Sequence, residues 1–257
     1  MQEFYKYHGA GNDFILIDNR KNDFLIDNQK IENLCNRRLG IGADGLILLN
    51  SSNDSSIDFK MQYFNADGFE GTMCGNGGRC IVAFANRLGI IDKHSIFQGV
   101  DGLHKADILY LQGNKTEIRL QMNDVHEIRL YDDGYFLNTG SPHVIRFVKD
   151  IHKMNVFEEG RIIRQKSEAN VNFVQIQDNN IFVRTFERGV EDETLSCGTG
   201  VVASALAVAK TQNLPSPIQI QTKGGDFVVS FDFVNNLFAN IWLWGKTCLV
   251  FKGILDE

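Results

Sequence analysis

The sequence lacks the marks of nucleic-acid-binding, secreted and membrane proteins. It has 26 lysines and arginines against 32 aspartates and glutamates, and no basic cluster is longer than the pair Arg37-Arg38. A net charge of −6 with no basic patch argues against binding to a phosphate backbone. Neither a basic and apolar leader nor a run of about 20 apolar residues occurs. We therefore expect a cytoplasmic protein that binds neither nucleic acid nor membrane.

The cysteines do not form a recognisable disulfide or metal pattern. They are five in number, widely spaced, without a Cys-x-x-Cys pair, and the chain has only six histidines. An odd, scattered set disfavours a disulfide framework and a zinc site. No pattern for pyridoxal attachment is visible either, so we expect no metal and no cofactor. The five residues are Cys35, Cys74, Cys80, Cys197 and Cys248.

The chain does contain one motif twice. The first copy runs from Phe64-Asn65-Ala66-Asp67-Gly68 to Cys74-Gly75-Asn76-Gly77-Gly78-Arg79, and the second from Phe186-Glu187-Arg188-Gly189 to Cys197-Gly198-Thr199-Gly200. Ten positions separate phenylalanine from cysteine in the first copy and eleven in the second. An apolar run follows each cysteine, at 81–85 and 201–209. This pattern predicts a cysteine at the start of a helix in each half.

The length of 257 residues and the repeat together predict two domains. A charged connection at 123–134 separates them, so we expect an N-terminal half at 1–122, with 250–257 packing back on it, and a C-terminal half at 123–249. The second helix is apolar nearly all round and must be buried. The predicted fold is therefore α/β (α+β), with two pseudo-symmetric domains, each a curled, mostly antiparallel sheet around a central helix, and an active site in the cleft between them.

Local patterns predict the remaining elements. Apolar residues at helical spacing predict a helix over 28–39, ended by Gly40 as its C-cap, and a short helix over 150–157. The first cysteine helix is expected to end near Gly89, and Leu214-Pro215 stops the second. Residues 4–18 form a strand broken by the turn at 8–13. Further strands are expected at 46–49, 59–64, 95–97, 106–111, 117–122, 135–138, 144–148, 172–177, 181–186, 218–222, 227–231, 237–244 and 248–251.

Two cysteines at helix starts permit a specific chemistry. A helix N-terminus carries unpaired N–H groups and about half a positive charge, so it binds anions and lowers the pKa of a thiol. A carboxylate held by both helix ends would place its α-carbon between Cys74 and Cys197, and a thiolate and a thiol could then invert that carbon. The helix-end residues that would hold the carboxylate are Gly75, Asn76, Gly198 and Thr199.

A structural interpretation competes with this one. Cysteine is commonly a small buried hydrophobe, and a glycine-rich turn is commonly only a turn; for one motif alone the two interpretations have equal weight. The duplication favours function for Cys74 and Cys197. Cys35, Cys80 and Cys248 lack that second signal and are interpreted as structural.

The motifs also resemble a known family. The sequence is similar to the diaminopimelate epimerases, which need no cofactor, along most of the chain. The matching segments are 8–14, 40–45, 64–68, 74–80, 140–143, 170–173, 187–189 and 197–200. The resemblance implies interconversion of LL- and meso-diaminopimelate, in lysine and peptidoglycan precursor biosynthesis, by an enzyme that we expect to be a homodimer.

The resemblance also implies roles for individual residues. Cys74 and Cys197 would be the two acid/base residues, and His143 an accessory histidine. The reacting carboxylate would be bound at Gly75, Asn76, Gly198 and Thr199. The amino groups and the distal end of the substrate would be read by Asn12, Asn65, Asn170, Glu187 and Arg188.

Two departures and two alternatives accompany this hypothesis. Gly45 stands where certain family members carry glutamine, and Ser141 where many carry asparagine, so distal contacts are expected to differ or to pass through water. The first alternative is a related cofactor-independent racemase acting on histidine or proline; proline racemases usually carry histidine where Asn76 stands. The second is a thiol redox or anion-binding module in which Cys74 and Cys197 form a switchable disulfide.

Overall fold

The computed structural model describes residues 1–177 and 180–255 and divides into two compact units. The N-terminal unit comprises Met1–Leu120 and the C-terminal segment from Lys246 onward, and the other unit comprises Gln121–Gly245. The boundaries expected from the sequence, after 122 and after 249, lie a few residues further along the chain. Residues 256–257 of the expected segment 250–257 lie outside the described part.

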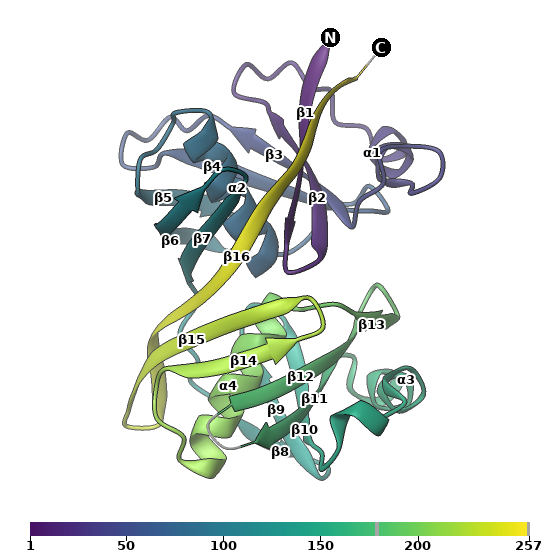
Figure 1. The fold of residues 1–257 in the computed structure, drawn as a ribbon, viewed down its shortest axis with the longest axis vertical. Helices are drawn as coiled ribbons and strands as arrows, with labels where there is room; N and C mark the ends of the chain where they lie inside the picture. Colours follow the sequence, from purple (N-terminus) through teal and green to yellow (C-terminus); the bar gives the residue numbers. More distant parts are fainter. Residues whose placement is uncertain (178–179, 256–257) are drawn as a thin grey trace. The chain divides into compact units, whose positions relative to one another are not determined.

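The N-terminal unit is mostly strands with two helices among its described residues (Figure 1). Its strands are β1 (Gln2–Gly9), β2 (Asn12–Asp18), β3 (Gly45–Asn50), β4 (Phe59–Asn65), β5 (His94–Gly99), β6 (Gly102–Gln112), β7 (Lys115–Gln121) and the later part of β16 (Leu237–Leu255). Its helices are α1 (Asn28–Cys35) and α2 (Gly75–Arg87).

The strands of this unit close into a barrel. They pair in the order β1-β2-β3-β4-β5-β6-β7-β16, and β16 also pairs with β1. The parallel pairs are β2–β3 and β4–β5, because a helix connects the strands of each. The other pairings are antiparallel.

Helix α2 occupies the centre of this barrel. Residues Gly75 to Ala85 are all buried, which a helix can sustain only if strands cover every side of it. Small residues permit the close fit: a Cβ on Gly77 would lie 3.0 Å from the Ile47 Cδ1 atom and 3.3 Å from the Met61 Cε atom. The barrel therefore fixes the position of the first turn of α2, where Cys74 stands.

The C-terminal unit repeats this arrangement. Its strands are β8 (Arg129–Tyr131), β9 (Gly134–Asn138), β10 (Pro142–Phe147), β11 (Asn170–Gln177), β12 (Asn180–Glu187), β13 (Asp192–Thr194), β14 (Ile218–Thr222), β15 (Gly225–Val234) and the first part of β16. Its helices are η1 (Ile151–Lys153), α3 (Val156–Ser167) and α4 (Gly198–Gln212).

The two units share one order of pairing. In the chain, α1 lies between the parallel strands β2 and β3, and α3 lies between the parallel strands β10 and β11. The central helix α2 lies between the parallel strands β4 and β5, and α4 lies between the parallel strands β12 and β14. Residues Gly198 to Ala209 of α4 are all buried. The predicted fold class, with pseudo-symmetric halves that each surround a helix with a mostly antiparallel sheet, is confirmed.

Helix α1 is shorter than predicted. It ends at Cys35 with Asn36 as its C-cap, and Leu39 is 90% exposed rather than part of the core. The reason is local: the Asn36 side chain accepts hydrogen bonds from the N–H groups of Arg38 and Leu39, both at 2.9 Å, and turns the chain. The prediction of Gly40 as C-cap was wrong.

Two further predictions are corrected. The predicted short helix at 150–157 is a 3₁₀ turn, η1, followed by the longer helix α3, which reaches Ser167. The strands predicted at 237–244 and 248–251 are one continuous strand, β16, which pairs with β15 through Gly245 and with β7 from Lys246. Its continuity carries the chain from the second unit into the first.

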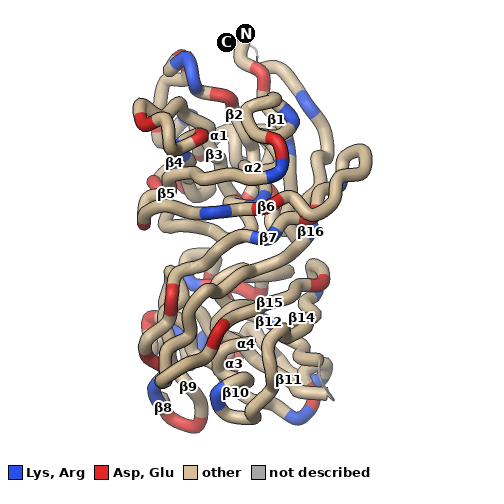
Figure 2. Tube along the Cα trace, turned by 90° about the vertical axis from the view of Figure 1, so that its left-hand side faces the viewer, with Lys and Arg blue, Asp and Glu red and all other residues tan. Residues whose placement is uncertain are grey.

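Charge is mixed along both units. In the view of Figure 2, basic and acidic positions are scattered among each other along the trace, and none of the described stretches forms a long basic stripe. No helix within residues 1–177 or 180–255 is long and apolar enough to cross a membrane.

Candidate active site

Cys74 is the N-cap residue of α2. Its backbone is extended, with φ −113° and ψ 116°, and its half-buried side chain faces the open end of the helix. The sulfur accepts a hydrogen bond from the Gly77 N–H at 3.4 Å. An N-cap side chain normally uses oxygen for this contact, so here the helix end stabilises charge on a sulfur.

Asn12 lies against that sulfur. A tight turn with positive φ at Ala10 (52°) and Gly11 (83°) joins β1 to β2 and places Asn12 at the start of β2. Its Oδ1 atom is 3.6 Å from the Cys74 Sγ atom, which can donate to it, and accepts from Asn76 Nδ2 at 3.2 Å. Its Nδ2 atom donates to Asp44 at 2.7 Å. Because a carboxylate only accepts, Asp44 fixes the amide with its oxygen toward Cys74.

A group of charged residues holds this turn. The Asp13 carboxylate contacts Lys6 Nζ and Arg37 NH2, each at 2.6 Å, and Arg37 also contacts Asp44 at 2.6 Å. Lys6 donates as well to the Gly42 carbonyl. Burial acts to raise the pKa of Asp13, but hydrogen bonds from Arg37 and Lys6 outweigh it and lower that pKa to about 2. The site therefore has a rigid, charge-balanced support.

Arg79 stands one turn into α2 and is fully buried. It donates to the Gly75 carbonyl at 3.0 Å and to Asn76 Oδ1 at 2.7 Å, which turns Asn76 Nδ2 toward Asn12. Burial lowers the pKa of the Arg79 guanidinium to about 10, still well above neutrality. A buried cation beside a helix N-terminus adds to its attraction for an anion.

The remaining predicted residue of this unit is Asn65, an exposed residue at the end of β4. It pairs in register with Gly45, and a Cβ on Gly71 would lie 3.1 Å from its Oδ1 atom. A Cβ on Gly45 would meet the Tyr63 ring at 2.5 Å, so in this chain Tyr63 takes space that a larger side chain at position 45 would need.

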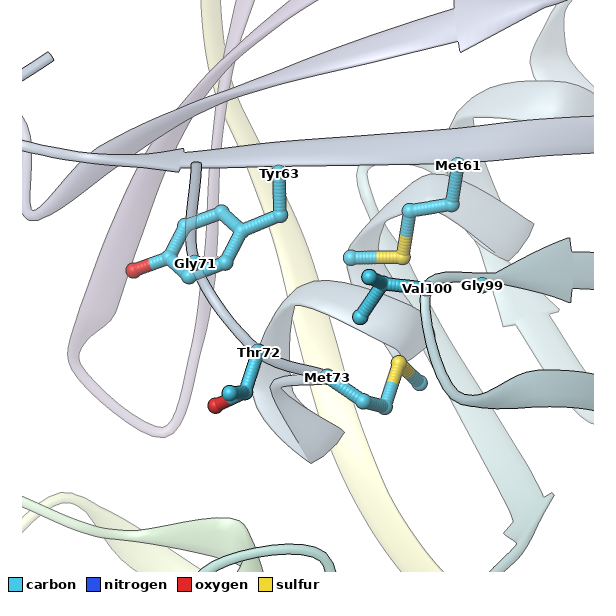
Figure 3. Close-up of a pocket in the computed structure, with 7 residues that line it drawn as sticks. All are labelled: Met61, Tyr63, Gly71, Thr72, Met73, Gly99 and Val100. Atoms are coloured by element: carbon cyan, nitrogen blue, oxygen red, sulfur yellow. The ribbon is translucent and has the colours of Figure 1, made fainter. Parts of the chain in front are cut away.

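A small apolar hollow lies behind the loop that leads to Cys74. In Figure 3 the side chains of Met61, Met73 and Val100 converge, while the Tyr63 ring covers Gly71. A Cβ on Gly71 would approach that ring at 2.6 Å. The side chains that line this hollow pack against the loop, and none of them is a carboxylate, a histidine or a cation that could act on a ligand.

Cys197 is the N-cap residue of α4, with φ −121° and ψ 114°, nearly the backbone of Cys74. Its side chain is 8% exposed. Its sulfur lies 3.4 Å from the Thr199 Oγ1 atom, in the first turn of the helix. The described contact of this sulfur is thus with a hydroxyl, which carries a proton, whereas the described side-chain contact of the Cys74 sulfur is with an amide oxygen, which does not.

His143 lies fully buried behind Thr199. Its Nε2 atom is 2.9 Å from Thr199 Oγ1 and 2.9 Å from Ser141 Oγ, and its Nδ1 atom is 3.0 Å from Asn172 Nδ2. Burial, followed by the charge of Arg188, lowers the pKa of His143 to about 3. The imidazole is therefore neutral at physiological pH.

Asn170 links this cluster to the strand end that carries the second motif. Its Oδ1 atom accepts from the Arg188 N–H at 2.9 Å, and its Nδ2 atom donates to Ser141 Oγ at 3.3 Å. Glu187 Oε2 accepts from Thr194 Oγ1 at 2.8 Å. Arg188 is exposed, and its NH1 group donates to the Glu168 carbonyl oxygen at 3.4 Å.

The predicted residues thus gather in two clusters, one in each unit. Asn12, Cys74, Gly75 and Asn76 form the first; His143, Asn170, Cys197, Gly198 and Thr199 form the second, with Glu187 and Arg188 beside it. Contacts identify further residues that sequence reasoning assigned no role: Asp44, Arg79, Asn172 and Thr185. The first three lie inside the quoted motifs, so their presence there was the available signal.

The other cysteines are not part of either cluster. Cys35 and Cys80 are buried, and burial raises the pKa of Cys35 to about 11 and that of Cys80 further. Within the described ranges, no group of three or more histidine, cysteine, aspartate or glutamate side chains is placed to hold a metal ion.

Solved structures share this fold at low sequence identity. A PhzF-family phenazine biosynthesis protein from Bacillus anthracis superposes with a TM-score of 0.76 at 15% identity, covering 99% of both chains. A hydroxyproline epimerase from Agrobacterium vitis superposes with a TM-score of 0.73 at 14% identity, covering 98% of this chain and 91% of that one. The protein therefore shares the fold of these solved structures. In this chain a cysteine stands at the N-terminus of each central helix.

The sequence comparisons are more specific. The profile of the family described as "Diaminopimelate epimerase" matches residues 4–121 and 135–240. Proteins named diaminopimelate epimerase are 49% identical in Flavobacterium psychrophilum, covering 97% of this chain and 98% of the relative, and 42% identical in Chlorobaculum tepidum, covering 96% and 98%. The chain belongs to the diaminopimelate epimerase family.

Proposed function

We propose that this chain interconverts LL- and meso-2,6-diaminopimelate, with Cys74 and Cys197 exchanging the α-proton as base and acid. The observation that carries the proposal is the matched position of the two cysteines, each the N-cap of a central helix that is buried except at its C-terminal end, with nearly the same backbone conformation. Membership of the epimerase family, with a relative that is 49% identical, supports the substrate.

The helix ends supply what the reaction needs most. An α-proton beside a carboxylate is a very weak acid, so the transition state must be stabilised where negative charge grows, on the carboxylate oxygens. Unpaired N–H groups at a helix N-terminus do this, at about 3–4 kcal/mol for each well-placed donor. Residues Gly75 and Asn76 on α2 and Gly198 and Thr199 on α4 would provide those donors.

The two sulfurs would act from opposite faces of the α-carbon. If each approaches the carbon to about 3.5 Å, the sulfurs stand about 7 Å apart in the substrate complex. One thiolate removes the proton, the carbon becomes planar, and the other thiol returns a proton to the opposite face. The product leaves the thiol and thiolate exchanged, ready for the reverse reaction.

Polar residues around the two cysteines would select diaminopimelate. Arg188 can form paired hydrogen bonds with the distal carboxylate, and Glu187 can accept from an ammonium group. Asn12, Asn65 and Asn170 can donate or accept. Ser141, where many relatives carry asparagine, offers a shorter hydroxyl, which leaves room for a water in that contact.

Proton exchange in D₂O tests the reaction and the substrate together. The enzyme is incubated with LL-diaminopimelate, histidine, proline and hydroxyproline, and deuterium at the α-carbon is followed by NMR. We expect exchange and epimerisation of diaminopimelate alone. Exchange with histidine or proline but not diaminopimelate would refute the substrate.

A further inference from the structure

Asn172 on β11 lies next to the candidate site without touching either cysteine in the contacts described. It is fully buried, and its Nδ2 atom faces His143 Nδ1 at 3.0 Å. The same Nδ2 atom donates to the Val144 carbonyl at 3.3 Å, while Oδ1 accepts from Thr185 Oγ1 at 2.9 Å. A backbone carbonyl can only accept, so the amide cannot be turned the other way.

This orientation determines where His143 carries its proton. An NH₂ group is a donor only, so the Nδ1 atom of His143 must accept, and the single proton of the neutral ring lies on Nε2. The Nδ1–H tautomer would place two donors face to face at 3.0 Å. The Nε2–H group then donates toward Ser141 Oγ and Thr199 Oγ1, each 2.9 Å away.

The hydroxyl protons are fixed in turn. Ser141 Oγ already faces two donors, His143 Nε2 and Asn170 Nδ2, so its own proton points to Thr199 Oγ1 at 3.0 Å. The Thr199 hydroxyl oxygen therefore accepts a hydrogen bond from Ser141 and shares with Ser141 Oγ the three-centre hydrogen bond donated by His143 Nε2–H. Its own proton is left for Cys197 Sγ, 3.4 Å away.

We infer that Asn172 is a positioning residue: by holding His143 as the Nε2–H tautomer, it directs the Thr199 hydroxyl proton onto the Cys197 sulfur. A hydrogen bond donated to sulfur favours the thiolate over the thiol. In the opposite tautomer the Nε2 lone pair would accept the Thr199 proton, and Cys197 would lose this donor. The inference rests on the proposed role of Cys197 as an acid/base residue.

One substitution at Asn172 should reverse the tautomer of His143. In Asn172→Asp the side chain keeps its size but accepts from Nδ1, as an aspartate does beside a catalytic histidine, and asparagine in such a position gives the other tautomer. Two-bond ¹H–¹⁵N correlations of ¹⁵N-histidine-labelled protein report the tautomer, with His143→Gln to assign the signal. The measurement is made at mildly alkaline pH, which keeps the imidazole neutral beside the ionised aspartate.

We expect the wild-type His143 to be protonated at Nε2 and the Asn172→Asp protein at Nδ1. For epimerisation at the same pH, we expect kcat to fall about ten-fold or more, the effect of one hydrogen bond to a charged group, while KM changes less than two-fold. Thr211→Val serves as the matched control, because its hydroxyl bonds the Ala207 carbonyl on the same helix at 2.8 Å; tautomer and kcat should both stay unchanged.

Two results would overturn the inference. One is a wild-type His143 protonated at Nδ1, a measurement that needs neither a variant nor turnover. The other is a folded Asn172→Asp protein whose tautomer has switched while kcat stays within two-fold of wild type. If Asn172→Asp does not fold, Thr185→Val provides a second test. It removes only the hydrogen bond to Asn172 Oδ1 and leaves Asn172 Nδ2 facing His143, so His143 must keep the Nε2–H tautomer. An enzyme that fails to epimerise diaminopimelate yet holds the Nε2–H tautomer would refute the proposed function and leave this assignment intact.

Discussion

At the residue scale, the two cysteines share a backbone conformation but differ in the group that faces the sulfur. Cys74 meets the Asn12 amide oxygen, fixed by Asp44, and the Gly77 N–H; Cys197 meets the Thr199 hydroxyl. The Asn12 amide oxygen can accept from a Cys74 thiol, whereas the Gly77 N–H can donate to a Cys74 thiolate. The Thr199 hydroxyl can donate to a Cys197 thiolate. The proposed proton transfer needs one thiol and one thiolate, and the described contacts differ between the two sulfurs.

The first prediction concerns the cysteines themselves. Cys74→Ala and Cys197→Ala should each lower kcat for epimerisation by about 100- to 10,000-fold, the usual contribution of a positioned acid or base. Cys80→Ala is the control, because Cys80 is buried on α2 and its substitution leaves both helix ends intact. Steady-state kinetics with coupled detection of meso-diaminopimelate measures the effect. Normal turnover in either Cys74→Ala or Cys197→Ala would disprove the two-base mechanism.

The second prediction follows from the lowered pKa of Asp13, about 2 against an ordinary 3.8. Since the folded state holds this carboxylate ionised, the unfolded chain binds the proton first as pH falls. The stabilisation is complete above about pH 4 and is lost as the pH falls through about 2, a change of about 2 kcal/mol. As the pH falls from about 4 to about 2, wild type should lose about 2 kcal/mol of unfolding free energy through this group. The Asp13→Asn protein lacks the carboxylate and should not lose this contribution.

Urea denaturation at a series of pH values measures this difference. At neutral pH the Asp13→Asn protein should be less stable, because Lys6 then keeps a buried charge without its carboxylate. Asp124→Asn, an exposed carboxylate that accepts from the Asn240 N–H, should keep the wild-type slope. Equal slopes for Asp13→Asn and wild type would contradict the role given to the Lys6–Asp13–Arg37 group.

At the element scale, sequence periodicity identified the central helices and gave the wrong extents for the peripheral ones. Helices α2 and α4 are signalled by a cysteine, glycines and a long apolar run, and both lie where predicted. Helix α3 buries only Val156 and Gly160, so it has too thin an apolar stripe to be extended past 157 by pattern alone. Leu39 shows the opposite error, because its spacing was helical but a capping asparagine had already ended α1.

The site divides in the same way. Sequence could place Cys74 and Cys197 because their signal is local, a cysteine before a glycine-rich helix start. Asp44 and Asn172 act through strand register, which a single sequence does not give: Asn172 lies opposite Thr185 across β11 and β12, and two residues beyond the partner of His143. Their roles become visible only when the sheet sets these residues side by side.

The third prediction tests how tightly α4 is seated. Gly200 lies against Asn172, and a Cβ at this position would collide with Asn172 Oδ1. Gly200→Ala should therefore lower the unfolding free energy by about 1–3 kcal/mol and lower kcat, because it displaces the amide that orients His143. Ala207→Gly, later in the same helix, should cost about 1 kcal/mol without affecting kcat. Gly200→Ala with unchanged kcat would show that Asn172 tolerates displacement.

At the scale of the whole molecule, the chain has built one unit twice. Each unit places a crossover helix between its first parallel pair of strands and a buried helix between its second. Strand β16 belongs to both units, pairing with β15 through Gly245 and with β7 and β1 from Lys246 onward. The repeated architecture gives two cysteines far apart in sequence nearly the same helix-cap geometry, which the proposed chemistry on two faces of one carbon requires.

The fourth prediction tests whether both cysteines serve a single substrate. If the sulfurs flank one α-carbon, then in the absence of substrate hydrogen peroxide should oxidise one to a sulfenic acid, which the other thiol attacks to form a disulfide, with two waters released. Activity should be lost and dithiothreitol should restore it. Peptide mapping by mass spectrometry should find Cys74 joined to Cys197, whereas Cys35 and Cys80 stay reduced because burial raises the pKa of each thiol and the thiolate is the reactive form.

Substrate present during the peroxide treatment should slow formation of the disulfide, since its α-carbon would separate the sulfurs. Loss of activity while Cys74 and Cys197 both remain as thiols would mean that the two sulfurs do not flank one α-carbon.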